Sequence, residues 1–246
     1  MSIVSVDLAY RHYRDIGVAV MHEKSNFIDA NLERIPLSGQ PTPDQLAEYF
    51  VDLADGSGSK YILIDGPQGW KDPDNGLIHS RVCERVLNTP AKTGLPNIVK
   101  PANYQPFVAF SISVFDELAR LGWSRLKSTS QEATQIVIET FPLSAWRSLS
   151  LLPLPAKAKC TQVMLQDRRT ALETVYPLRF SGQPTHDELQ AVVAGLAGLA
   201  VESRRTAEYS TSGVAPFMLH AAHREGFILS PLRRSHGAAA QSTTLT

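Results

Sequence analysis

The sequence predicts an α/β fold in which one mixed β-sheet carries helices on both faces. Three apolar or alternating segments follow one another near the N-terminus, and after residue 42 helical and strand-like segments alternate. The 246 residues suffice for one large α/β domain, and no internal repeat or long linker divides them. We therefore expect a single domain over residues 1–232.

The first three segments predict an antiparallel hairpin followed by a third strand. Residues 2–10 (SIVSVDLAY) are apolar and β-branched, and residues 15–23 (DIGVAVMHE) follow after a short polar turn. Residues 25–35 alternate between apolar and polar side chains, which is typical of a strand with one exposed face.

A helix and a fourth strand come next. We expect Thr42 to cap the helix, Pro43 to occupy its first turn and Gln45 to complete a capping box. The loop DGSGSK then leads into a strand at 61–67, within YILIDGPQGW. Because the loop lacks P-loop spacing and precedes a strand, it predicts a linker and not a phosphate site.

The remaining segments continue the alternation. Helices predicted at 78–88 and 105–123 form a helical insertion over about residues 70–130, and a fifth strand follows at 134–142. Further helices are predicted at 158–176, 184–205 and 215–226, before a short last strand at 227–231. Residues 233–246 predict a flexible tail.

The composition is that of an ordinary globular protein, with 43% hydrophobic and 20% charged residues. Lys+Arg 24 balances Asp+Glu 24, so no global field draws the chain to nucleic acid or membrane. Cys83 and Cys160 lie far apart in the sequence and predict reduced thiols, with a single disulfide bond between them as the alternative. No stretch approaches the roughly 20 apolar residues of a membrane span. We expect a cytoplasmic protein.

Carboxylates interrupt or end three of the apolar runs. Asp7 follows the run at 3–6, Asp65 ends the run at 62–64, and Glu139 ends the run at 136–138. If these strands are parallel neighbours, the three side chains converge at one edge of the sheet, where their mutual repulsion requires a cation. Oxygen ligands of this kind fit Mg²⁺ or Mn²⁺.

The helix predicted at 184–205 offers a fourth carboxylate, Asp187. Ala191, Ala194 and Gly198 share its helical face, so the helix could approach the sheet closely. The alternative is purely structural, because Thr185 and Glu188 form a capping-box pattern around Asp187. Turn amides could likewise satisfy the strand-end carboxylates.

The motifs VSVDLAY, YILIDGPQGW, RVCER, VIETFPLSAWR and HDELQAVVAGLAG resemble family 429 of the domains of unknown function. That family is regarded as predicted nucleases of the ribonuclease H-like fold, and the motifs are also similar in outline to Holliday-junction resolvases. The resemblance covers most of residues 1–230. It implies a five-stranded sheet of order 3-2-1-4-5, with the helical insertion between strands 4 and 5.

By the same resemblance, Asp7, Asp65 and Asp187 match the metal-binding acids, with Glu139 as an addition. Gln190 stands where the resolvase-like helix carries a second acid, so the site could bind either one or two metal ions. The implied function is metal-dependent hydrolysis of phosphodiester bonds in DNA or RNA. Five basic residues could bind substrate phosphates, although the alternative for each is an ordinary solvated surface charge. They are Arg81, Arg85, Arg147, Lys159 and Arg168.

Two other functions remain open at this stage. A phosphotransferase of the actin and sugar-kinase type has a related core, but the segment VDLAYRHYRD lacks the glycine-rich phosphate loop that such enzymes need. A non-catalytic module that binds nucleic acid or protein could also keep the fold with a weakened site. The sequence distinguishes neither DNA from RNA nor one oligomeric state from another.

Overall fold

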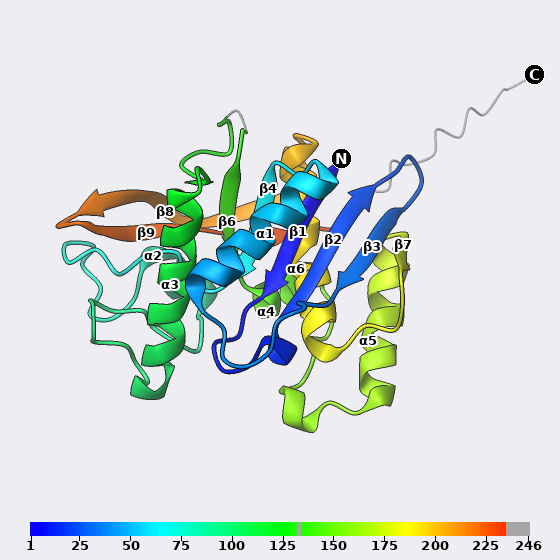
Figure 1. Cartoon of the computed structure of the whole chain (residues 1–246), viewed down its shortest axis with the longest axis horizontal. Coiled ribbons are helices and arrows are strands. Elements are labelled where there is room, and N and C mark those ends of the chain that lie inside the picture. The colour runs from blue at the N-terminus through cyan, green and yellow to red at the C-terminus, as the bar shows by residue number, and fades with distance from the viewer. Residues whose placement is uncertain (132–133, 235–246) are drawn as a thin grey trace, which may run out of the picture.

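A computed structural model describes residues 1–131 and 134–234, and all strands of these residues belong to one sheet (Figure 1). The strands are β1 (Ser2–Asp7), β2 (Gly17–Glu23), β3 (Ile28–Glu33), β4 (Tyr61–Asp65), β5 (Ser124–Arg125), β6 (Ile136–Thr140), β7 (Leu178–Phe180), β8 (Tyr209–Leu219) and β9 (Ala222–Pro231). The α-helices are α1 (Pro43–Ser57), α2 (Val82–Leu87), α3 (Gln105–Arg120), α4 (Pro142–Ser148), α5 (Gln162–Val175) and α6 (His186–Glu202).

The centre of the sheet has the predicted order. β2 lies antiparallel between β1 and β3, while β4 lies parallel to both β1 and β6. With β6 as the fifth core strand, the order 3-2-1-4-5 of the ribonuclease H-like fold is confirmed. The sheet is wider than predicted, because β7 extends the β3 side and β9 and β8 extend the β6 side, with β5 pairing with β6.

Helices cover both faces of the sheet, as predicted. Because side chains alternate along a strand, Val4 and Val6 pack with α1 and α3, while Ile3 faces α6. In Figure 1, α1 and α3 lie on the viewer's side of the sheet, with α6 behind it. The faces alternate in the same way along β4, where Ile62 and Ile64 belong to one core and Leu63 to the other.

Small residues bring α6 close to the sheet, as the sequence predicted. A Cβ atom on Gly198 would overlap the side chain of Leu63, and one on Gly195 would overlap Met21 and Ser5. The hydroxyl of Ser5 also donates to the carbonyl of Ala191 at 2.7 Å. This close packing fixes the N-terminus of α6 beside the ends of the central strands.

Two local predictions are wrong. Residues 215–226 form no helix, because β8 and β9 make a hairpin that projects to one side of Figure 1. Thr42 and Pro43 do take the predicted N-cap and first-turn positions of α1, but the capping box does not form: the Thr42 side chain makes no capping hydrogen bond, and the side-chain oxygen of Gln45 accepts from the hydroxyl of Tyr13 at 2.6 Å. The capping box of Thr185 and Glu188 does form at the start of α6.

The helical insertion between β4 and β6 contains α2 and α3, joined by long loops. Residues 235–246, most of the predicted tail, lie outside the described part of the chain, and the domain boundary at residue 232 stays a prediction. Among the described residues, no helix has the length and apolarity needed to cross a membrane.

Candidate metal centre and adjoining pocket

Asp7 and Asp65 lie side by side at the carboxyl ends of β1 and β4. The two residues are direct partners in the parallel register, and both project toward the face of the sheet that α6 covers. The carboxyl group of each residue affects the pKa of the other. The strands alone therefore bring two of the predicted acids together.

The N-terminus of α6 adds two more polar side chains. Asp7, His186 and Asp187 each offer one ligand atom, and these three atoms lie within 4.8 Å of one another. Gly17, the register partner of Asp7 on β2, permits this approach, because a Cβ there would overlap the backbone of Asp187. We name Asp7, Asp65, His186 and Asp187 the acidic cluster.

The carbonyl of Pro155 orients the ring of His186 so that Nδ1 faces the acidic cluster. Its Nε2 lies 3.0 Å from the carbonyl oxygen of Pro155, which can only accept, so Nε2 carries a proton. In the neutral ring, Nδ1 is then unprotonated, yet it lies 2.9 Å from Oδ1 of Asp187. A proton or a metal ion must relieve this contact between two acceptors, and a histidine with its second nitrogen donating to a carbonyl is the usual metal-binding arrangement.

Burial and neighbouring carboxylates disfavour the charged forms of Asp7 and Asp65. Burial, followed by the nearby Asp65 and Asp187 carboxylates, raises the pKa of Asp7 well above its ordinary value. Burial, with a further contribution from Glu139, raises the pKa of Asp65 to about 7. Near neutral pH the pair gains from any cation that binds between the carboxylates.

A lysine supplies part of that positive charge. Lys157, in the 3-10 helix η3 (Lys157–Lys159), donates to Oδ1 of Asp15 at 2.9 Å and also donates to Oδ2 of Asp187. Burial alone would lower the pKa of Lys157, but these two hydrogen bonds outweigh it and the pKa is raised. Its side chain is 50% exposed, so it can leave the cluster without breaking the core.

The donor set fits a divalent ion. Asp7, Asp65 and Asp187 provide carboxylate oxygens, the preferred ligands of Mg²⁺ and Mn²⁺. His186 adds a nitrogen donor, and burial, which raises the pKa of both the Asp7 and the Asp65 carboxyl groups, makes a bound cation favourable for their charged forms. Gln190 takes no part in the cluster, because its side-chain oxygen accepts from the indole of Trp146 at 2.7 Å.

Glu139 belongs to a different arrangement, although it also lies near the end of its strand. In the register of β4 and β6 it pairs with Ile64, while Thr140 pairs with Asp65. This offset of one residue turns Glu139 toward the opposite face of the sheet. There its two carboxylate oxygens accept from the guanidinium of Arg81 at 2.7 and 2.6 Å, and one also accepts from the backbone N–H of Gln68 at 3.0 Å.

Arg81 also donates to Glu84 at 3.1 Å, and Glu84 accepts from the backbone and hydroxyl of Thr93. We name Arg81, Glu84, Thr93 and Glu139 the buried ion-pair network. Each of its members is almost inaccessible to water, with Arg81 1% exposed and Glu139 2% exposed. The structure therefore does not bring the Glu139 carboxylate into the acidic cluster, where the sequence pattern had suggested it.

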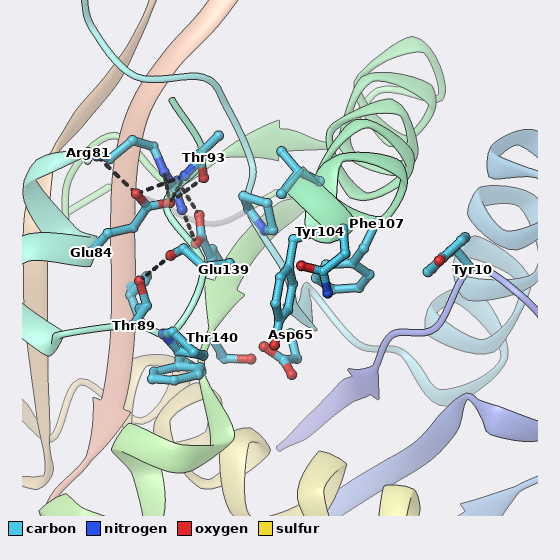
Figure 2. Close-up of a pocket in the computed structure, with 18 of the residues that line it drawn as sticks. Tyr10, Asp65, Arg81, Glu84, Thr89, Thr93, Tyr104, Phe107, Glu139 and Thr140 are labelled. Atoms are coloured by element: carbon cyan, nitrogen blue, oxygen red, sulfur yellow. Dashed lines mark hydrogen bonds and ion pairs between the residues drawn. The ribbon is translucent and has the colours of Figure 1, made fainter. Parts of the chain in front are cut away.

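A pocket of about 450 Å³ lies between the acidic cluster and this network (Figure 2). Figure 2 shows the network on one side of the pocket and the rings of Tyr104 and Phe107 on the other. Asp65 and Thr140 point into the space between them. Asp65 thus belongs to the acidic cluster and also lines the pocket.

The five predicted phosphate-binding cations are dispersed. Arg81 lines the pocket, but its guanidinium is occupied by the two glutamates. Arg85 and Arg147 are exposed on α2 and α4, and Lys159 is exposed two residues from Lys157. Arg168, on α5, donates to the carbonyl of Pro153 at 3.3 Å.

Three residues of the site were not predicted from the sequence. His186 precedes Asp187 directly, and an imidazole beside a predicted ligand was a usable signal. Lys157 gave none, because it lies in the short 3-10 helix η3, whose position depends on the whole fold. Thr140 follows Glu139, and only the strand register shows that it, and not Glu139, is the partner of Asp65.

Comparisons with known proteins add little to this geometry. No protein-family profile matches the chain, and no curated protein matches it. Among solved structures, RuvC from T. thermophilus in complex with a Holliday junction substrate resembles it with 12% sequence identity and a TM-score of 0.35. The match covers 87% of this chain and 98% of that one. The strand order described above, and not this likeness, defines the fold class.

Proposed function

We propose that the protein is a divalent-metal-dependent nuclease that hydrolyses phosphodiester bonds of DNA or RNA. The observation that supports this function is the acidic cluster, in which residues far apart in the sequence meet at the carboxyl ends of β1 and β4. Ligands of α/β sheets commonly bind at such strand ends. The fold alone does not imply the function, so the proposal depends on the cluster.

In this proposal, Asp7, Asp65 and Asp187 hold the ion, and Nδ1 of His186 contributes a further donor. A bound Mg²⁺ or Mn²⁺ supplies an activated water and stabilises the leaving oxygen. Pro155 fixes the ring of His186 through its carbonyl, and the Gly17 contact fixes Asp187 relative to Asp7. Glu139 acts indirectly, by holding Arg81 and the wall of the pocket in place.

Substrate phosphates would need cations at the rim of the cluster. We propose Lys159 for this role, together with Lys157 once a metal ion has displaced it from Asp187. Arg85, Arg147 and Arg168 remain further candidates from the sequence, whereas the guanidinium of Arg81 is already bound by Glu84 and Glu139.

The test is cleavage of labelled single-stranded, duplex and branched DNA and RNA by the purified full chain, with Mn²⁺, Mg²⁺ or EDTA. We expect cleavage with metal only, and its loss in Asp7→Asn by at least about 100-fold, because a metal ligand is removed. Asp52→Asn, on the exposed side of α1, is the matched control and should cleave normally. Cleavage that survives Asp7→Asn would contradict the proposal.

A metal-dependent rise in melting temperature tests the ion site separately from cleavage. A ligand at about 100 times its Kd stabilises a protein by about 2.7 kcal/mol, or about 5–11 °C for a domain of this size. We expect such a shift with millimolar Mn²⁺ in the wild type and not in Asp7→Asn.

One observation favours a second candidate, a non-catalytic binding module. Lys157 already forms an ion pair with Asp187, so the cluster is partly neutralised without a metal. Such a module would show neither cleavage nor a metal-dependent melting shift. The two measurements together therefore separate a nuclease from a module that has kept only the fold.

A further inference from the structure

We propose that the pocket between Tyr104, Thr140 and Asp65 binds the base of a nucleotide, with the ring against the aromatic wall and its polar edge at Thr140. The further claim that this base belongs to the nucleotide whose phosphate meets the acidic cluster rests on the proposed function.

The size and walls of the pocket fit a flat ring. Its volume of about 450 Å³ falls within the usual range of small-molecule sites. Tyr104 and Phe107 form one wall, Phe141 lines the pocket from the end of β6, and Tyr10 lies 6.5 Å from Phe107 between ring centroids. Aromatic walls of this kind stack on the faces of bases without regard to sequence.

Thr140 indicates that the ligand has a polar edge. Thr140 is 1% exposed, and its Oγ1 has no hydrogen-bond partner among the described residues. Buried polar atoms of this kind normally have a partner, so this hydroxyl has unused capacity. It can both donate and accept, as the edge of a base requires. Figure 2 shows it directed toward Asp65, which lines the same pocket.

The charge of the lining favours a neutral ring over an anion. Asp65, Glu84 and Glu139 all line the pocket, and the guanidinium of Arg81 is already bound to the two glutamates. Arg11 lines the pocket as an exposed side chain, with its guanidinium 5.4 Å from the centre of the Tyr10 ring. The three carboxylates would therefore repel a phosphate from the interior, whereas an uncharged base could contact Asp65 and the exposed Arg11 without such repulsion.

Asp65 connects the pocket to the acidic cluster. The same side chain lines the pocket and lies beside Asp7, so a base in the pocket would place its own sugar and phosphate next to the cluster. The site would then recognise a single unstacked nucleotide, because a base within a duplex cannot enter a pocket of this kind.

The pocket is tested with nucleosides, which carry no phosphate, by ligand-observed NMR on the full chain in EDTA. We expect at least one of the common nucleosides to bind with a Kd of millimolar order or tighter. Thr140→Val keeps the shape of the side chain and removes the hydroxyl, and should weaken binding about 5- to 10-fold. Tyr104→Leu should weaken it by at least about 5-fold through lost stacking.

Thr211→Val, on the exposed part of β8, is the matched control and should bind like the wild type. Melting temperatures of all variants show that each is folded. No nucleoside binding up to about 10 mM, or equal binding by wild type and Thr140→Val, would overturn the proposal. Phenol binding as tight as that of the best nucleoside would also overturn it, because the pocket would then be a general apolar site.

The measurement does not depend on the proposed function, because it needs neither metal nor cleavage. Nucleoside binding without any nuclease activity would support the base-binding pocket and contradict the proposed nuclease function. If both hold, Mn²⁺ should tighten binding of a nucleoside monophosphate and not of the nucleoside, and Asp7→Asn should abolish that difference. Equal effects of Mn²⁺ on both ligands would overturn the link between pocket and cluster.

Discussion

The acidic cluster and the buried ion-pair network lie near the ends of adjacent strands, yet they balance their charges in opposite ways. In the network, Arg81 makes hydrogen bonds to both Glu84 and Glu139. In the acidic cluster, the carboxyl groups of Asp7 and Asp65 lie side by side, and Lys157 makes its hydrogen bonds to Asp187 and Asp15. The first arrangement satisfies its charges internally, and the second leaves charge for an external cation.

The difference originates in one residue of register. Asp65 pairs with Thr140, so Glu139 faces the side of the sheet on which the insertion supplies Arg81. A carboxylate at a strand end is therefore not by itself evidence of a metal site. What distinguishes the two is whether the fold provides a buried cation for each carboxylate.

The largest effect should come from breaking the network. Glu139→Gln leaves the buried Arg81 with one fewer charged partner, and removing one member of a buried pair typically destabilises a protein by about 3–5 kcal/mol. Because Glu84 remains bound to Arg81, we expect a loss near the lower limit, about 3 kcal/mol, measured by urea unfolding.

Glu173→Gln is the control for that experiment. Its ion pair with Arg169 has a similar distance of 2.9 Å but is partly exposed on α5, so its loss should change stability by less than about 1 kcal/mol. Equal losses in the two variants would show that the network is no more important to stability than a surface pair.

A smaller effect of opposite sign should come from the acidic cluster. Burial raises the pKa of Asp65 to about 7, so the metal-free folded state holds protons that the unfolded chain has released. The contribution of the Asp65 carboxyl group to stability should therefore fall as pH rises from about 4 to about 7. Asp65→Asn removes that titration, and should raise the stability of the metal-free protein by about 1–2 kcal/mol at pH 8.

Melting temperatures in EDTA between pH 4 and pH 8 measure this effect. The wild type should lose more stability over this range than the Asp65→Asn variant. At pH 8 the melting temperature of the variant should be higher by about 2–8 °C. A variant that is less stable than the wild type at pH 8 would mean that Asp65 already has a cationic partner in the folded protein.

The centre of the fold could be predicted from the sequence because its signals are local. Buried strands such as 61–65 read as short apolar runs bounded by turn residues, and the small residues of 184–205 predicted close packing of α6 on the sheet. The hairpin of β8 and β9 could not, because His220 and Ala221 make its two-residue turn with positive φ values of 50° and 58°. Such turns normally contain Asn or Gly, so the usual hairpin signal is missing.

The candidate site could be predicted only in part. Asp7, Asp65 and Asp187 have visible positions at strand ends and a helix start, and the fold brings them together. The partners that decide what each carboxylate does come from loops and the insertion, as with Lys157 and Arg81. Their positions depend on tertiary packing that no short pattern records.

The smallest effect should come from Lys157, because this residue partly neutralises the acidic cluster as Arg81 neutralises the buried ion-pair network. Its ammonium group occupies an oxygen of Asp187 that a metal ion would need, so it competes with the ion. We expect Lys157→Gln to tighten Mn²⁺ binding about 3-fold, with a change in metal-free stability below about 1 kcal/mol because the lysine is half exposed. Lys159→Gln removes the same charge two residues away on an exposed side chain, and should leave the affinity nearly unchanged. If both variants tighten binding equally, the general loss of positive charge is responsible, and direct competition at Asp187 is not.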